Sequence, residues 1–178
     1  LGDVYKRQEY GYVIHKLDYK NCVFVLGNRN FTPLELLVKN DENCELLDKV
    51  YIGKEKRDKI QNINKWISEN EFLEVNKIIV YDAIQKIILD NEQKYLDYIN
   101  LNVDDELHKK TLSQGFRLGP KTTDKILIAK NEKEFNSLKD LEERAKTNIF
   151  IKNLIQKIYN EISGKDKLRI FANKAKHL

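Results

Sequence analysis

The chain has 178 residues, of which 34% are charged and 41% are hydrophobic, a balance typical of a globular protein with a heavily solvated surface. Its formal net charge of +4 is small, so the distribution of charge along the chain, and not the total, must indicate whether a polyanion is a partner.

The longest apolar runs are Cys22–Leu26 and Ile78–Tyr81, far shorter than the ~20 residues of a membrane span. No basic, apolar and small-residue signal layout opens the chain, so we expect a cytoplasmic protein with no membrane partner. Cys22 and Cys44 form no CxxC pair, which favours two buried thiols of an intracellular protein over a disulfide framework or a zinc site.

Within the first eight residues, the stretch Asp3–Gln8 resembles the in-frame translation of a transposon adapter used in sequencing libraries. We expect residues 1–8 to be a cloning or assembly artefact and exclude them from the fold prediction. The absence of Met from the chain agrees with a lost natural start.

Residues 9–54 have the pattern of a small β domain. Alternation over Tyr10–Ile14 has the period of a half-buried strand, and turn-forming residues separate the runs Cys22–Leu26, Phe31–Val38 and Lys49–Gly53. Several short strands in so little sequence predict a small N-terminal β-barrel of OB type.

Residues 55–165 are predicted to form a helical domain. The spacing of Ile60, Ile63, Trp66 and Ile67 predicts a first helix, and a longer one is expected from about Val75 to Ile99.

Two more helices follow in the same domain. Ser137–Asp140 has the form of a capping box that should begin one helix, and the apolar face over Ile151–Ile162 predicts another, which ends at Ser163-Gly164. Residues 166–178 complete the chain as a short strand, Lys167–Ala172, that returns to the barrel, and a basic tail. The predicted fold class is therefore α+β.

The segment Leu107–Lys130 carries the chemistry of interest, with six basic residues against one acid. Gly119 permits a close backbone approach to a ligand, and Pro120 favours a first helical turn. The amides near Lys121–Thr123 would then face an anion along the helix dipole. We place a helix-hairpin-helix at about residues 105–162. The predicted phosphate-binding residues are Gly115, Arg117, Gly119, Lys121, Thr122, Thr123 and Lys125, with Lys109, Lys110, Lys54 and Arg57 as auxiliary contacts.

The same segment also has a purely structural interpretation, and its sequence argues against some other functions. Gly119-Pro120 can simply be a tight turn before a new helix. The segment does not match a nucleotide-hydrolysing P-loop. The P-loop pattern needs its two glycines five positions apart with Lys directly after the second, whereas Gly115 and Gly119 are four apart and Pro120 follows. His15, His108 and His177 are scattered without metal-ligand spacing, so we expect no enzyme, no metal and no cofactor.

The chain resembles an archaeal family of unknown function, domain of unknown function 655. The matching stretches are Phe31–Val38, Asp48–Lys54 with Arg57–Ile60, the hairpin, Phe135–Leu141 and Lys167–Phe171. The resemblance implies an OB-like domain before a helix-hairpin-helix domain, and binding of nucleic acid or nucleotides. The usual hairpin has Gly-x-Gly, whereas Gly115 and Gly119 bracket three residues. Either the loop is longer, or Arg117 stands at the first Gly position.

Two functions follow from these features. The first is sequence-independent, non-enzymatic binding of DNA or RNA, because a clamp on backbone phosphates does not read bases. The alternative is a protein-interaction or assembly module of a ribosomal or DNA-repair complex, in which the hairpin only packs helices.

Overall fold

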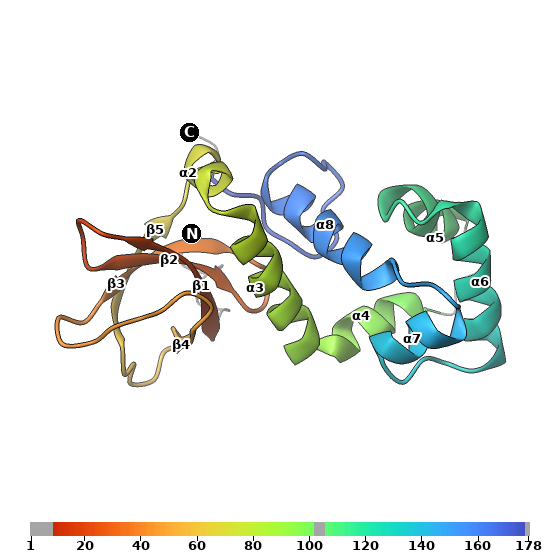
Figure 1. Cartoon of the computed structure of the whole chain (residues 1–178), viewed down its shortest axis with the longest axis horizontal. Helices are drawn as coiled ribbons and strands as arrows, with labels where there is room; N and C mark the ends of the chain where they lie inside the picture. The colour runs from red at the N-terminus through yellow and green to blue at the C-terminus, as the bar shows by residue number, and fades with distance from the viewer. Residues whose placement is uncertain (1–8, 102–105, 177–178) are drawn as a thin grey trace. The chain divides into compact units, whose positions relative to one another are not determined.

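The computed structural model describes residues 9–101 and 106–176, and the chain has α+β structure (Figure 1). It divides into two compact units: unit 1 comprises residues 1–87 and 158–178, and unit 2 comprises residues 88–157. The expected artefact at residues 1–8 and the last two residues of the basic tail lie outside the described residues. No helix in the described part is long and apolar enough to cross a membrane.

Unit 1 contains a curled five-stranded antiparallel half-barrel with the strand order β4-β1-β2-β3-β5. Its strands are β1 (Tyr10–Leu17), β2 (Cys22–Gly27), β3 (Pro33–Val38), β4 (Lys49–Tyr51) and β5 (Ile60–Trp66). A register shift between Val13 and His15 bends β1. Gly11 permits close packing of β1 on β2, because a Cβ there would lie 2.7 Å from the Val25 side chain.

The core of the sheet is made of apolar side chains from all five strands and the loops between them. Its fully buried members include Val13, Val25, Leu34, Leu36, Val50 and Ile60. Ile63 and Trp66 of β5 pack against this core while partly buried.

The helix predicted across Ile60–Ile67 is wrong, because residues 60–66 form β5. Register shifts in the β3–β5 pair explain the misleading spacing. In β3 the residues Leu34, Leu36 and Val38 are two positions apart. Their partners in β5 are three positions apart, because β5 accommodates two extra residues. A bulged strand therefore imitates helical periodicity, and the sheet continues beyond the predicted boundary at residue 54.

Unit 1 also contains helix α2 (Glu69–Glu74), and α3 (Lys77–Asp90) and α8 (Phe150–Ile162) each run from one unit into the other. The Ser68 hydroxyl accepts the Glu71 amide hydrogen at the start of α2 in a complete capping box. The single long helix predicted over residues 75–99 is interrupted at Asn91, where φ is −129°, so that α4 (Glu92–Ile99) is a separate helix.

The strand predicted at Lys167–Ala172 is also wrong. Oε1 of the buried Glu161 accepts three consecutive amides, those of Ile170, Phe171 and Ala172, at 2.8, 2.8 and 3.0 Å. These amides are therefore not available to a β ladder. The segment does return to the β structure, because the Asn173 amide donates to the Asn30 carbonyl at 2.9 Å.

Unit 2 is helical, with α4, α5 (Glu106–Lys110), one π-helical turn η1 (Thr111–Gly115), α6 (Gly119–Glu132), α7 (Leu138–Arg144) and the first part of α8. The Ser137 hydroxyl caps α7 as predicted, by accepting the Asp140 amide hydrogen at 2.9 Å. The Asp140 carboxylate accepts the Asn136 amide instead of completing the box. Gly164, with φ +79°, follows α8 near the predicted stop.

Candidate nucleic-acid interface

The turn between η1 and α6 contains two residues in the left-handed region, Arg117 with φ +52° and Gly119 with φ +77°. The Phe116 amide donates to the Thr111 carbonyl at 3.0 Å, which ends the η1 turn. Phe116 and Leu118 alternate with the two left-handed residues and are both buried. The turn is therefore anchored by two apolar side chains, and the Arg117 amide donates to the Gln114 carbonyl at 3.2 Å.

A side chain far away in the sequence fixes this turn. Nδ2 of Asn153, on α8, donates to the Phe116 carbonyl at 2.9 Å and to the Arg117 carbonyl at 3.2 Å. The Phe116 ring lies 6.1 Å from the Phe150 ring, centroid to centroid. Both contacts are within unit 2, so the shape of the turn is set before any ligand binds.

The N-terminus of α6 lacks the side-chain cap that α2, α3 and α7 have, and α4 lacks one too. Ser68 caps α2, Ser137 caps α7, Asn76 accepts amides at the start of α3, and Glu142 accepts the Ile151 amide in the first turn of α8. The N-cap position of α6 is Leu118, which has no acceptor.

The α6 terminus therefore has amides available to a ligand. Pro120 has no amide hydrogen, and those of Gly119 and Lys121 meet no acceptor within residues 9–101 and 106–176. Unpaired first-turn amides and the positive end of the helix dipole favour an anion.

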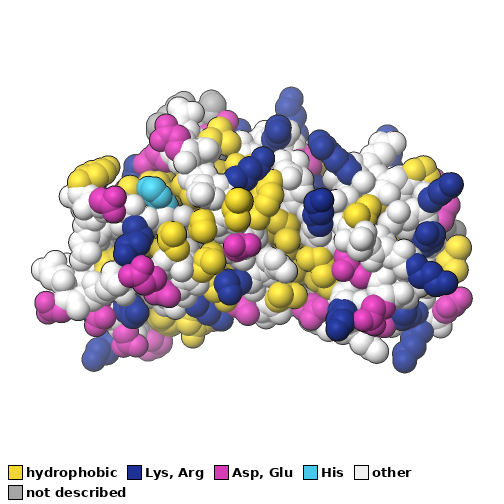
Figure 2. Space-filling view, in the orientation of Figure 1, with side chains coloured by type: hydrophobic (Ala, Val, Ile, Leu, Met, Phe, Trp, Pro, Cys, Tyr) yellow, Lys and Arg dark blue, Asp and Glu magenta, His cyan; other side chains and the backbone are white. Residues whose placement is uncertain are grey.

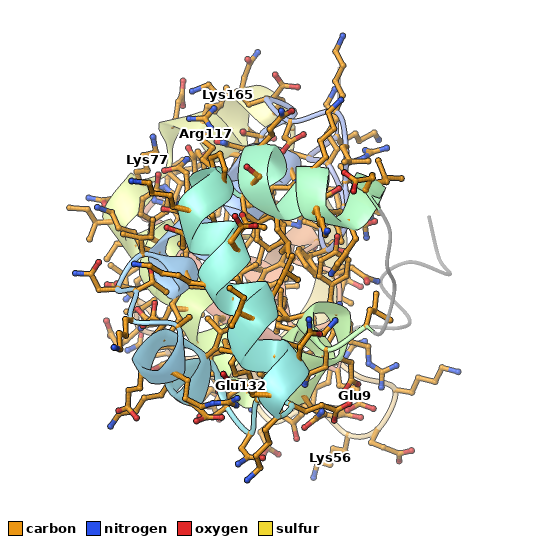
Figure 3. All side chains as sticks on the ribbon, turned by 90° about the vertical axis from the view of Figure 1, so that its right-hand side faces the viewer. Glu9, Lys56, Lys77, Arg117, Glu132 and Lys165 are labelled. Atoms are coloured by element: carbon orange, nitrogen blue, oxygen red, sulfur yellow. The ribbon has the colours of Figure 1, made fainter. Side chains whose placement is uncertain are left out.

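The structure brings most of the predicted phosphate-binding residues to this end of α6. The side chains of Arg117, Lys121 and Lys125 are exposed, and that of Thr122 is half-buried. Figure 3 shows Arg117 at one end of α6 and Glu132 at the opposite end. One cation thus lies in the turn before α6 and two lie in its first two turns, where they add to the field of the amides.

Two predicted residues do not belong to the exposed turn. The Thr123 side chain is 2% exposed and its hydroxyl donates to the Gly119 carbonyl at 2.8 Å, so it stabilises the first turn of α6. Gly115 is the last residue of η1 and has no positive φ. Its absent Cβ would make only ordinary contacts, 3.5 Å from Thr111 and 4.0 Å from Lys157.

An open pocket of about 530 Å³ lies between the α5–η1 helix and the first turns of α6. The predicted auxiliary residues Lys109 and Lys110 line it together with Pro120, so the structure brings them beside the α6 N-terminus. Glu106 and Asp124 line it too, so the pocket itself is not strongly basic. In Figure 2 dark blue lysine and arginine side chains gather with interspersed acids over α5 and α6 at the right-hand edge.

The other two auxiliary residues, Lys54 and Arg57, lie in unit 1. Nε and Nη2 of Arg57 donate to the Gly53 and Ile52 carbonyls at 2.9 and 3.2 Å. Arg57 therefore closes the loop between β4 and β5, while Lys54 is exposed.

The two cysteines are free and buried, as the sequence predicted. Burial raises the pKa of both the Cys22 and the Cys44 thiol above the ordinary value of 9.0. No group of three or more metal-ligating side chains occurs among the residues that the structure describes.

Sequence reasoning missed the residues that hold the turn in place. Asn153 is 36 residues from Arg117, on a helix whose periodicity reveals only the apolar face. Ser113 and Gln114, which line the pocket, carry no motif. Only its contact with a distant segment identifies Asn153, and no local pattern reports such a contact.

Comparison with known proteins agrees with the resemblance seen in the sequence. The family model described as "Protein of unknown function (DUF655)" matches residues 7–173. The chain belongs to the DUF655 family. The uncharacterised protein MJ0038 of Methanocaldococcus jannaschii is 27% identical over 175 residues, which cover 93% of this chain and 80% of that relative. Among solved structures, this DUF655 chain is similar to Af1531 of Archaeoglobus fulgidus, with a TM-score of 0.76, 26% identity, and coverage of 92% of this chain and 99% of that one.

Proposed function

We propose that this DUF655 protein binds nucleic acid without regard to sequence and without catalysis, by holding a backbone phosphate at the N-terminus of α6. The observation that carries the proposal is the uncapped first turn of α6, with the amides of Gly119 and Lys121 available beside the exposed Arg117 and Lys125. Amides and cations of this kind grip phosphate oxygens and do not contact base edges.

The α5–η1 helix, the turn and α6 fit the proposal of a helix-hairpin-helix. Arg117 and Gly119 are both left-handed and two residues apart, the spacing of the two glycines in a Gly-x-Gly hairpin. This geometry favours the interpretation in which Arg117 stands at the first Gly position and Gly115 takes no part. A side chain at Arg117 then adds a cation at a position where the usual hairpin has only backbone.

We also propose that unit 1 is an OB-type domain that contacts nucleic acid. The five-stranded sheet is curled and partly open, and its outer strands β4 and β5 pair with β1 and β3 instead of with their sequence neighbours, which suits a Greek-key arrangement. Tyr19, in the loop between β1 and β2, is 78% exposed, and the Lys20 ammonium lies 5.1 Å from its ring centroid. OB modules use the corresponding loop for binding.

The proposal is tested by reversing the charges of the clamp. Fluorescence anisotropy with labelled single- and double-stranded DNA and RNA should show binding by the unaltered protein and a loss of tenfold or more in the Arg117→Glu/Lys121→Glu double variant, since several charge-assisted contacts are removed. The Lys139→Glu/Lys152→Glu variant, with the same charge change on α7 and α8, should retain most of the affinity. Equal affinity in the clamp variant and the unaltered protein would refute the proposal.

The interaction-module function remains a second candidate because of two exposed apolar side chains on helices of unit 2. Leu107 on α5 is 64% exposed and Ile128 on α6 is 62% exposed, and Leu107 lines the pocket beside the α6 terminus. A protein partner would cover such side chains. If the protein binds phosphates, replacing both Leu107 and Ile128 with Gln should leave nucleic-acid binding unchanged. If it is an interaction module, the same replacement should abolish binding of a protein partner recovered after nuclease treatment.

A further inference from the structure

A second pocket, of about 350 Å³, lies within unit 1 at the end of β5, where Trp66 also packs against the hydrophobic core of the sheet. Its walls are the turn residue Asn30, the last residue of β5, Trp66, and the C-terminal segment from Arg169 to Lys174. The phosphate clamp does not use any of these residues. The volume is at the small end of the range for small-molecule sites.

The C-terminal wall of the pocket is held in place by hydrogen bonds on both flanks. The Glu161 carboxylate accepts the amides of Ile170, Phe171 and Ala172. Asn173 holds the other end of the segment in place, since its Nδ2 donates to the Thr32 hydroxyl at 2.9 Å. The segment has no regular secondary structure, yet its backbone is fixed, and a preformed wall lowers the entropic cost of binding a ligand.

The residues that line the pocket supply three kinds of group. Trp66 is aromatic, Asn30 and Asn173 carry amides, and Arg169 and Lys174 are cations. No acid is among the lining residues, although Lys174 forms an ion pair of 3.8 Å with Glu69. Arg169 is exposed and forms no ion pair or hydrogen bond with the residues that the structure describes. The cation that remains available is therefore Arg169.

Trp66 has an unpaired donor in its indole ring. The Nε1–H is buried and meets no acceptor in the described part of the chain. A buried donor without a partner is rare in native proteins because it loses its hydrogen bond to water. Because this nitrogen has almost no accessible surface, a ligand would accept its hydrogen after a rotation of the ring toward the pocket.

We propose that this pocket binds one unpaired nucleotide of a single-stranded nucleic acid. The base would contact the Trp66 ring, a donor on its polar edge would meet Oδ1 of Asn173, whose Nδ2 is held by Thr32, and Arg169 would bind the phosphate. Aromatic rings, amides and an arginine are the groups by which proteins hold splayed-out nucleotides. This inference rests on the proposed function for its biological sense, and it adds that unit 1 selects single strands.

Trp66 is the only tryptophan of the chain, so the fluorescence of the intact protein comes from a residue that lines this pocket and packs against the sheet core. Titration with adenosine monophosphate, uridine monophosphate or a short single-stranded oligonucleotide should change the Trp66 emission in a saturable way. Inorganic phosphate should not, because it brings no base. An unchanged emission at millimolar nucleotide and at saturating oligonucleotide would overturn the proposal.

Two variants separate the pocket from surface charge in general. Arg169→Gln should weaken the nucleotide affinity measured from the Trp66 fluorescence about tenfold or more, since a charge-assisted hydrogen bond to phosphate is lost. Lys167→Gln changes an exposed lysine of the same segment outside the pocket lining and should bind as the unaltered protein does. An equal response in all three proteins would contradict the assignment of Arg169.

The Arg117→Glu/Lys121→Glu variant distinguishes failure of this inference from failure of the proposed function. If both sites exist, this variant loses affinity for duplex probes and keeps the Trp66 response to mononucleotides. If this variant loses duplex binding and the unaltered protein shows no Trp66 response to nucleotides, the clamp is supported and the nucleotide pocket is refuted.

Discussion

The two glycines near the turn should respond in opposite ways to replacement by alanine. Gly119 has φ +77° and no atom within 4 Å of the position of a Cβ, so Gly119→Ala adds no clash, only left-handed strain of about 1–2 kcal/mol. A gain of about 0.4–1 kcal/mol from the stiffer unfolded chain offsets part of this strain. The net loss in the free energy of unfolding is then about 1 kcal/mol.

Gly115 lies in helical backbone, and its added Cβ would make contacts of 3.5 and 4.0 Å, which are ordinary van der Waals distances. Gly115→Ala should therefore stabilise unit 2 by about 0.5–1 kcal/mol. It should also leave nucleic-acid affinity unchanged, because Gly115 is outside the turn.

Urea unfolding followed by far-ultraviolet circular dichroism measures both variants, with Trp66 fluorescence as a separate probe of unit 1. The predicted difference between the two variants is about 1.5–2 kcal/mol. If Gly115→Ala destabilises the protein as much as Gly119→Ala does, the helical placement of Gly115 is wrong. A loss of affinity in Gly115→Ala would show that the first glycine takes part in the clamp.

Three further predictions concern stability and reactivity. Glu161→Ala should lower the free energy of unfolding by about 3 kcal/mol or more, because three amides lose their acceptor; a loss below about 1 kcal/mol in urea unfolding would contradict this role. Burial acts to raise the pKa of Glu71, but hydrogen bonds from Ser68 and the Lys65 ammonium outweigh it and hold the pKa below the ordinary 4.5. The stability that Glu71 adds is therefore full above pH 4.5 and is lost as the pH falls through the lower folded value, so Glu71→Gln should be less stable than the unaltered protein at neutral pH and equally stable in strong acid. The Cys22 and Cys44 thiols should react with a thiol reagent at pH 8 far more slowly in the folded than in the urea-unfolded protein, because they are buried and their pKa values are raised; equal rates would show that the sheet does not protect them.

Local patterns predicted the elements whose residues depend mainly on their own neighbours. The apolar face of α8 and the serine cap of α7 were predicted from spacing alone, and Gly119-Pro120 marked the start of α6. In each case the signal is a property of one helix, such as a repeat of 3.6 residues or a cap.

The errors arose where distant segments decide the structure. β5 was predicted as a helix because two extra residues, accommodated opposite β3, converted strand alternation into a spacing of three. The C-terminal segment alternates like a strand, but a single carboxylate, Glu161, accepts its amides. In the candidate site the sequence supplied the charges and the glycine, while Asn153, which fixes the turn, had no local signature.

The central claim is that phosphate contacts at the α6 N-terminus hold nucleic acid, and the salt dependence of binding tests it most directly. The logarithm of the association constant for duplex DNA should fall linearly with the logarithm of salt concentration, with a slope of about 0.9 per phosphate contact. The Arg117→Glu/Lys121→Glu variant should show a slope smaller by about 2, because two cations leave the interface. Binding that does not change with salt, or an identical slope in the variant, would contradict the account.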